Sequence, residues 1–198
     1  MSLDRFYPIF DRAEWLPRML PLGVKLMQLR IKDQPLDVVR SDIKIAKKLC
    51  ADYGCELVVN DFWEIAMDEG CDFIHLGQED MDTADMAAIQ KAGIRFGLST
   101  HDETELDRAL SYNPEYVALG PVYPTILKKM KWTEQGLDRV TEWKKLVGDT
   151  PLVGIGGMSV ERAAGVFAAG ADIVSVVTDI TLNTDPEARL TEWVKATR

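Results

Sequence analysis

The chain has 198 residues, of which 46% are hydrophobic and 28% charged, a composition typical of a globular domain with a sizeable core. Its formal net charge of −9 and sequence pI of about 4.8 argue against nucleic acid or an anionic membrane as a partner, because neither would meet a basic surface. A local cluster of cations within an acidic protein can still bind an anionic small molecule.

The sequence shows no sign of membrane insertion, secretion or division into domains. No apolar run approaches the roughly 18 residues that span a bilayer, and the first residues lack the pattern of a secretory signal. The three cysteines, Cys50, Cys55 and Cys71, are too few and too irregularly spaced to predict disulfides or a zinc site. We therefore expect one domain over residues 1–198 in a reducing, cytoplasmic location.

Short apolar runs alternate with amphipathic segments along the whole chain. The runs predict strands at residues 7–10, 25–31, 56–60, 73–77, 95–100, 116–122, 151–157 and 173–177. The amphipathic segments predict helices at residues 36–53, 83–92, 103–110, 134–147, 160–169 and 186–196. In the first of these helices, Val39, Ile43 and Ala46 recur at steps of four and three, which keeps one face apolar.

Strict alternation of strands and helices predicts a parallel sheet covered by helices. Eight strand-helix units indicate an α/β fold closed into a single (β/α)8 TIM barrel. The main rival is an open, doubly wound sheet, which would place a glycine-rich fingerprint after the first strand, but residues 7–12 contain no glycine. Since barrels carry their chemistry at the C-terminal ends of the strands, polar residues at those ends are the candidates for a site.

The second predicted strand carries an unusual set of polar residues. Period-two alternation places Gln28, Arg30 and Lys32 on one face and the apolar residues 27, 29 and 31 on the other. If the apolar set faces the helices, the polar set points into the barrel, where cations are costly to bury without an anion. The pattern indicates an anion-binding site, and the alternative is an internal ladder of ion pairs with neighbouring strands.

Carboxylates follow the third and fourth predicted strands. Asn60 and Asp61 end the third strand, and Asp80 follows the fourth. Neighbouring strands lie about 4.8 Å apart, so both carboxylates can reach one ion. Two carboxylates suit Mg²⁺, which takes its other ligands from water and substrate phosphates. Asp61 could instead cap a helix that begins near Phe62.

The remaining strand ends add possible phosphate contacts. Ser99, at the end of the fifth strand, is placed to donate to a phosphate oxygen, whereas His75 and His101 are interpreted as structural. The proline- and lysine-rich stretch 120–131 is typical of a lid that meets an anion, or of a solvated basic loop. Glycines within residues 154–157 would let backbone N–H groups approach a phosphate, unless they serve only a tight turn.

Two anion-binding regions, one over strands two to five and one over strands seven and eight, suggest an enzyme that joins or converts two phosphorylated small molecules. The ordered motifs resemble those of the thiamine phosphate synthase family. They are Gln28-Leu29-Arg30-Ile31-Lys32, Asn60-Asp61, His75-Leu76-Gly77-Gln78-Glu79-Asp80, Gly97-Leu98-Ser99-Thr100-His101, Gly120-Pro121-Val122-Tyr123-Pro124-Thr125, Gly154-Ile155-Gly156-Gly157-Met158 and Val176-Val177-Thr178. Each motif is weak alone, but the ordered set is specific and extends through nearly the whole chain.

The resemblance implies a transferase that couples 4-amino-2-methyl-5-hydroxymethylpyrimidine pyrophosphate with hydroxyethylthiazole phosphate, giving thiamine phosphate and pyrophosphate. It implies that pyrophosphate leaves first and that the thiazole nitrogen captures a pyrimidine-methylene cation. The expected partners are these small molecules, with neither nucleic acid nor membrane. The sequence leaves the oligomeric state open, and a homo-oligomer is compatible with it.

The resemblance also implies roles for particular residues. The group that stabilises the leaving pyrophosphate is Arg30, Lys32, Ser99 and Lys128. The substrate-binding group is Gln28, Arg30, Lys32, Asn60, Ser99, Thr125, Lys128, Gly157, Val177 and Thr178. The pair that holds the Mg²⁺ cofactor is Asp61 and Asp80.

The sequence departs from the family pattern after the sixth strand. The family usually has Thr-x-Thr-Lys there, and Leu127 takes the place of the second threonine, which removes one hydroxyl donor. Thr178 stands where serine is usual and keeps its hydroxyl. Lys129 and Lys131 leave open which lysine reaches the pyrophosphate.

Two alternative functions remain. Thiazole tautomerase relatives share the barrel, lose much of the Mg²⁺-pyrophosphate set and use a histidine in the loop after strand six, where this chain has Pro121 and no histidine. A non-catalytic phosphate-binding barrel is the other alternative, which the loss of a hydroxyl at Leu127 keeps open.

Overall fold

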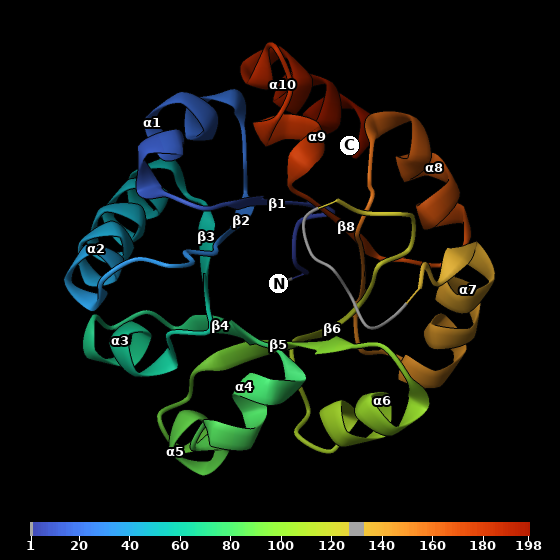
Figure 1. The fold of residues 1–198 in the computed structure, drawn as a ribbon, viewed down its shortest axis with the longest axis horizontal. Coiled ribbons are helices and arrows are strands. Elements are labelled where there is room, and N and C mark those ends of the chain that lie inside the picture. Colours follow the sequence, from blue (N-terminus) through green and yellow to red (C-terminus); the bar gives the residue numbers. More distant parts are fainter. Residues whose placement is uncertain (1, 127–132) are drawn as a thin grey trace.

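A computed structural model describes residues 2–126 and 133–198 as a closed barrel of parallel strands (Figure 1). The strands are β1 (Phe6–Phe10), β2 (Leu26–Leu29), β3 (Glu56–Asn60), β4 (Phe73–Leu76), β5 (Arg95–Thr100), β6 (Tyr116–Leu119), β7 (Leu152–Ile155) and β8 (Ile173–Val176). They pair in chain order, and β8 closes the barrel against β1 with Tyr7 beside Ser175. The predicted single (β/α)8 TIM barrel is confirmed.

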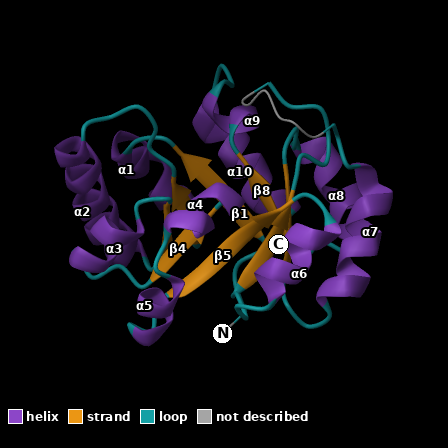
Figure 2. Ribbon diagram, turned by 60° about the horizontal axis from the view of Figure 1, so that its bottom comes forward, coloured by secondary structure: helices purple, strands orange, loops and turns teal. Residues whose placement is uncertain are grey.

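Helices surround the barrel, as the view into it and a second, oblique view show (Figures 1 and 2). They are α1 (Leu16–Met19), α2 (Leu36–Tyr53), α3 (Trp63–Asp68), α4 (Gln78–Thr83), α5 (Met86–Lys91), α6 (Glu103–Leu110), α7 (Gly136–Val147), α8 (Val160–Ala168), α9 (Thr178–Thr181) and α10 (Pro186–Ala196), with short 3₁₀ turns at Ala13–Trp15 and Leu20–Leu22. None of the helices in the described ranges is both long enough and apolar enough to cross a bilayer.

Most predicted elements are present, with differences at their ends. The predicted second strand stops at Leu29 and the sixth at Leu119, so the residues beyond them belong to loops. The predicted helix over residues 83–92 is wrong in its extent, because Ala84 is extended and separates α4 from α5. Asp85 then caps α5 by accepting a hydrogen bond from the Ala88 N–H.

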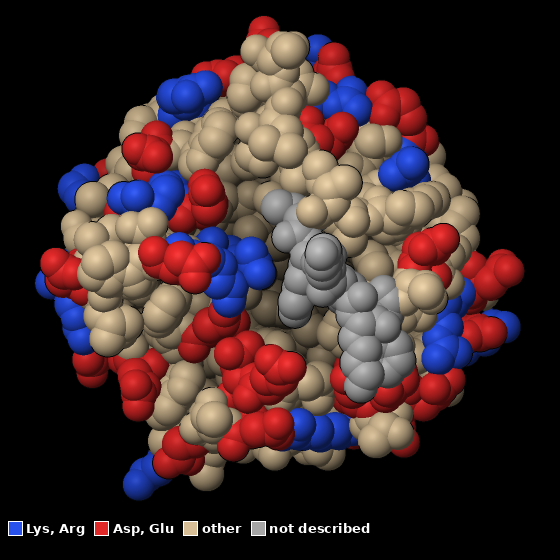
Figure 3. Space-filling view, in the orientation of Figure 1, with Lys and Arg blue, Asp and Glu red and all other residues tan. Residues whose placement is uncertain are grey.

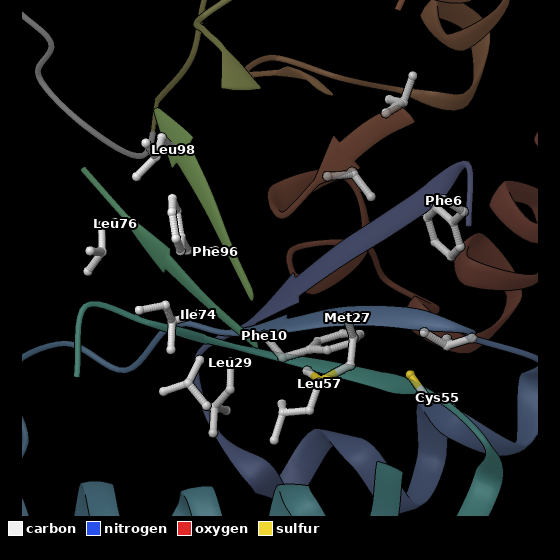
Figure 4. Packing of buried hydrophobic residues seen from close by; sticks show 14 of the residues in the cluster. Phe6, Phe10, Met27, Leu29, Cys55, Leu57, Ile74, Leu76, Phe96 and Leu98 are labelled. Carbon is white, nitrogen blue, oxygen red and sulfur yellow. The ribbon is translucent and has the colours of Figure 1, made fainter. Parts of the chain in front are cut away.

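Two apolar layers determine where open space remains. The outer layer lies between strands and helices and includes Phe10, Leu29, Ile74 and Leu98 (Figure 4). A smaller cluster of side chains fills the barrel interior: Tyr7, Leu26, Val58, Phe73, Tyr116, Ala118, Val153 and Ile173. Because this inner cluster fills the barrel toward the N-terminal ends of the strands, the space left for a ligand lies toward their C-terminal ends.

Candidate active site

A cavity of about 530 Å³ lies at the C-terminal ends of the strands. Lys and Arg side chains and Asp and Glu side chains gather beside the hollow in the centre of this face (Figure 3). The predicted site residues that line the cavity are Gln28, Arg30, Lys32, Asn60, Asp61, Asp80, Ser99, Thr125, Gly157, Val177 and Thr178. Lys128, Leu127, Lys129 and Lys131 lie outside the described residues. One pocket therefore contains all the predicted site residues that the structure describes.

The chain that follows β2 forms the cationic side of the pocket. Met27, Leu29 and Ile31 belong to the outer core, whereas Gln28, Arg30 and Lys32 face the pocket, as the alternation predicts. The Arg30 N–H donates to the Phe10 carbonyl (2.8 Å), which extends the β1–β2 pairing beyond the strand. Lys32 forms an ion pair with Asp61. This pair lies at the pocket rim, where Lys32 is 47% exposed, so it is not a buried ladder within the barrel.

The chain turns sharply at Asp61, directly after β3. Asp61 has a φ of 62°, and its N–H donates to the carbonyl of His75 on β4 (3.0 Å). Helix α3 has Phe62 as its N-cap, without a side-chain capping hydrogen bond. The interpretation of Asp61 as a helix cap is therefore wrong. The left-handed turn leaves the Asp61 carboxylate at the pocket, beside Lys32.

Asp80 projects from the first turn of α4. Its carboxylate accepts a hydrogen bond from the Gly77 N–H (3.1 Å), and a Cβ on Gly77 would lie 2.9 Å from that carboxylate oxygen. Burial raises the pKa of Asp80, the Asp61 carboxylate raises it further, and Lys32 opposes the shift. Two carboxylates thus lie close enough to repel each other, which a cation between them would relieve.

The described residues contain no cluster of three or more His, Cys, Asp or Glu side chains that could hold a metal ion. Asp61 and Asp80 supply only two protein ligands. A cation at this position would take its remaining ligands from water or from a bound phosphate, as Mg²⁺ commonly does.

A buried hydrogen-bonded chain crosses the floor of the pocket. Gln28 Nε2 donates to the Tyr7 hydroxyl (2.9 Å), which lies 2.7 Å from the Tyr116 hydroxyl. Tyr116 in turn contacts His75 Nδ1 (2.8 Å), and His75 Nε2 contacts Ser99 Oγ (2.9 Å). Burial lowers the pKa of His75 to about 4 and raises the pKa of both tyrosines. His75 is therefore neutral at neutral pH.

Sequence reasoning did not identify Tyr7 and Tyr116 as site residues. Both lie within apolar strands, and only their hydroxyl groups, which need partners when buried, distinguish them from ordinary core residues. A Cβ on Gly97 would lie 2.0 Å from the Tyr116 ring, so glycine at this position makes room for the ring. His75, which the sequence analysis interprets as structural, is buried but also lines the pocket.

Two short segments form the opposite side of the pocket. Gly156 and Gly157 follow β7 with φ values of 93° and 62°, and a Cβ on Gly157 would lie 2.4 Å from the Pro124 carbonyl. Glycine is thus required both for the turn and for close packing against the loop after β6. Val177 and Thr178 begin α9, whose Asp179 accepts hydrogen bonds from the α10 side chains Arg189 and Trp193.

The model of one protein family, described as thiamine monophosphate synthase, matches residues 6–180. The chain belongs to the thiamine monophosphate synthase family. Among relatives in this family, a thiamine-phosphate synthase of Rhizobium etli is 59% identical over 197 residues, covering 100% of this chain and 97% of that protein. A thiamine-phosphate synthase of Citrobacter koseri is 42% identical over 191 residues, covering 96% and 87%.

Solved structures with the same fold include a thiamine phosphate pyrophosphorylase from Pyrococcus furiosus. It superposes with a TM-score of 0.87 at 24% identity, covering 99% of this chain and 96% of that one. A 3-hexulose-6-phosphate synthase superposes with a TM-score of 0.70 at 14% identity, covering 98% and 100%. At these identities the two structures support the barrel fold shared by the thiamine monophosphate synthase family, and the sequence relatives carry the family assignment.

Proposed function

We propose that this protein is a transferase that couples 4-amino-2-methyl-5-hydroxymethylpyrimidine pyrophosphate with hydroxyethylthiazole phosphate to give thiamine phosphate and pyrophosphate. The observation that carries the proposal is the cluster of Arg30 and Lys32 beside the Asp61–Asp80 pair in one pocket, within a chain of the matching family. This arrangement suits a magnesium pyrophosphate. The two carboxylates would bind the metal ion, and the two cations would bind the phosphate oxygens.

Asp61 and Asp80 are the proposed ligands of Mg²⁺. Both offer hard oxygen atoms at the pocket, and the repulsion that helps to raise the pKa of Asp80 favours a cation. When bound there, Mg²⁺ would supply positive charge to the oxygens of a pyrophosphate. The ion pair from Lys32 holds the Asp61 carboxylate at the pocket rim.

The cationic and polar residues around that position are proposed to stabilise the departing pyrophosphate. This group gains negative charge as its bond to the pyrimidine methylene carbon breaks, so fixed donors bind the transition state more strongly than the substrate. Arg30, Lys32 and Ser99 line the pocket where this charge would develop. Lys128 has the same proposed role. Gln28 and Asn60 would bind the pyrimidine pyrophosphate before the bond breaks.

The opposite side of the pocket is proposed to bind the thiazole phosphate. Thr125 and Thr178 offer hydroxyl groups, and Gly157 and Val177 offer backbone approaches to a phosphate. Thiazole nitrogen would then capture the cation left on the pyrimidine methylene carbon. This division of the pocket gives each phosphorylated substrate its own set of donors.

We also propose that residues 1–198 form one barrel domain and that the protein is cytoplasmic. Three buried free cysteines, Cys50, Cys55 and Cys71, suit a reducing compartment. The thiazole tautomerase activity and the non-catalytic phosphate-binding barrel are the alternatives that an assay must separate.

One assay distinguishes these functions. The protein is incubated with both substrates and Mg²⁺, and thiamine phosphate and pyrophosphate are measured together. Release of both products supports the proposal. Interconversion of thiazole isomers without coupling would indicate the tautomerase, and binding without turnover would indicate the phosphate-binding barrel.

The Asp80→Ala variant tests the metal site within the same assay. Loss of one carboxylate should lower turnover on the order of 10²-fold and weaken its dependence on Mg²⁺. Asp82→Ala is the matched control, because Asp82 lies on the same helix but is 64% exposed and pairs with Arg108. Unchanged kinetics in Asp80→Ala would remove Asp80 from the metal site.

A further inference from the structure

The chain of hydrogen bonds on the pocket floor has a direction that follows from counting protons. Gln28 Nε2 can only donate, so the Tyr7 hydroxyl accepts from it (2.9 Å). Each tyrosine hydroxyl carries one proton, and both are buried, with Tyr7 1% exposed and Tyr116 0%. A buried hydroxyl proton without an acceptor is costly, so each proton must point to a neighbour in the chain.

The donor and the acceptor can be assigned in the next two hydrogen bonds, from Tyr7 to Tyr116 and from Tyr116 to His75. Among the described residues, the other hydrogen-bonding neighbour of the Tyr7 hydroxyl is the Tyr116 hydroxyl (2.7 Å), so Tyr7 donates to Tyr116. Tyr116 has accepted that proton and donates its own to His75 Nδ1 (2.8 Å). His75 Nδ1 is then the acceptor, and the imidazole proton resides on Nε2.

The last bond carries the direction into the pocket. His75 Nε2–H donates to Ser99 Oγ (2.9 Å), so the serine oxygen already accepts one hydrogen bond, from His75. The Ser99 hydroxyl proton is then free to point toward a ligand in the cavity that Ser99 lines. An anionic oxygen is the acceptor that such a fixed donor suits.

We propose that Tyr7, Tyr116 and His75 are positioning residues that hold the Ser99 hydroxyl as a donor to the departing pyrophosphate. This inference rests on the proposed function, because that function supplies the anion. The opposite direction would place the imidazole proton on Nδ1 and turn the Ser99 proton toward His75 Nε2. It would also leave the Tyr7 hydroxyl, already bonded by Gln28, with two donors and no acceptor for its own proton.

The tautomer of His75 can be measured without any substrate. The chain has only 2 histidines, so ¹⁵N-histidine labelling gives a spectrum in which His101→Gln identifies the second ring. We expect the Nε2–H tautomer of His75 in the free protein. The Nδ1–H tautomer would overturn the proposal, whatever the protein catalyses, so this result is separate from the test of function.

Kinetic measurements test whether the hydrogen-bonded residues Tyr116 and His75 act through Ser99. Ser99→Ala should lower kcat on the order of 10²-fold. Tyr116→Phe keeps the ring over Gly97 and removes the donor to His75, and we expect it to lower kcat roughly tenfold, because Ser99 loses its orientation but not its hydroxyl. KM should change little, since the donor gains strength as charge develops on the leaving group.

The double variant Ser99→Ala/Tyr116→Phe decides between a positioning role and a merely structural one. If Tyr116 acts through Ser99, the double variant should have the kcat of Ser99→Ala alone, to within about twofold. Multiplicative losses would overturn the proposal. Tyr7→Phe removes a buried hydroxyl one step further from Ser99 and leaves Tyr116 able to donate to His75, so kcat should fall less than in Tyr116→Phe.

Discussion

His75 is a histidine kept neutral by its surroundings, with both ring nitrogens bonded inside the barrel. Burial lowers its pKa to about 4, whereas an unfolded chain has a histidine pKa near 6.5. Between these values the unfolded chain takes up a proton that the folded protein does not bind. His75 therefore does not reduce the free energy of unfolding above about pH 6.5. As the pH drops from there toward 4, its titration lowers the free energy of unfolding by up to about 3 kcal/mol.

Urea unfolding at pH 7 and at pH 5 measures this contribution. Wild type should lose free energy of unfolding at the lower pH, and His75→Gln should lose less, because it has no proton to gain. His101→Gln is the control, since it removes the other histidine and leaves His75 in place. An equal loss in wild type and His75→Gln would show that His75 does not titrate in this way.

The sequence predicts which polar residues in and directly after β2 face the pocket, but it does not predict the hydrogen bonds on the pocket floor. The alternation of Gln28, Arg30 and Lys32 is visible in the sequence because polar residues interrupt an apolar strand. The floor chain is not, because Tyr7 and Tyr116 come from β1 and β6 and meet only across the closed barrel. Their contact depends on closure, which no local pattern encodes.

The segment between β7 and α8 depends on glycine for two separate reasons. Gly157 has a φ of 62°, and a Cβ there would lie 2.4 Å from the Pro124 carbonyl. Gly157→Ala should therefore displace the loop after β6 as well as strain its own backbone. We expect a loss of about 2–3 kcal/mol in stability and on the order of 10²-fold in turnover.

Gly93→Ala is the matched comparison, because Gly93 has a φ of 70° and open space around its Cβ position. It should cost only the left-handed backbone term, about 1 kcal/mol, with little change in turnover. Urea unfolding and the coupling assay measure both quantities. Equal effects of the two substitutions would show that contact with Pro124 is unimportant.

Long elements were easier to predict than short ones. The limits of α2, Leu36–Tyr53, follow from its periodicity over several turns and from Gly54, which ends it in a left-handed conformation. Helices α4 and α9 span 6 and 4 residues, too short for a periodic pattern to appear. Both follow strands and carry Asp80 and Thr178, so the elements hardest to predict hold part of the candidate site.

Ligand binding should stabilise the whole barrel. If Mg²⁺ and pyrophosphate bind together at the pocket, ligand at about 100 times its Kd adds roughly 2.7 kcal/mol to the folded state. For a protein of this size that corresponds to a rise in Tm of about 5–10 °C. Thermal unfolding with both ligands, with each alone and with neither measures the effect.

Asp80→Ala should lose most of the rise in Tm, and Asp82→Ala should keep it. Because pyrophosphate and Mg²⁺ bind as a pair in the proposed site, either ligand alone should give a smaller rise. If pyrophosphate raised Tm equally without Mg²⁺, the carboxylate pair would have no part in binding it.

The packed side chains beneath the pocket also determine the order in which ligands can bind and leave. Tyr7, Phe73 and Tyr116 fill the barrel below the cavity, so a molecule that enters from the C-terminal face must leave by the same mouth. If two ligands lie one above the other in this cavity, the inner one must enter first. The inner of two such ligands can leave only after the outer one has gone, so a cavity with a single opening imposes an order on both binding and release.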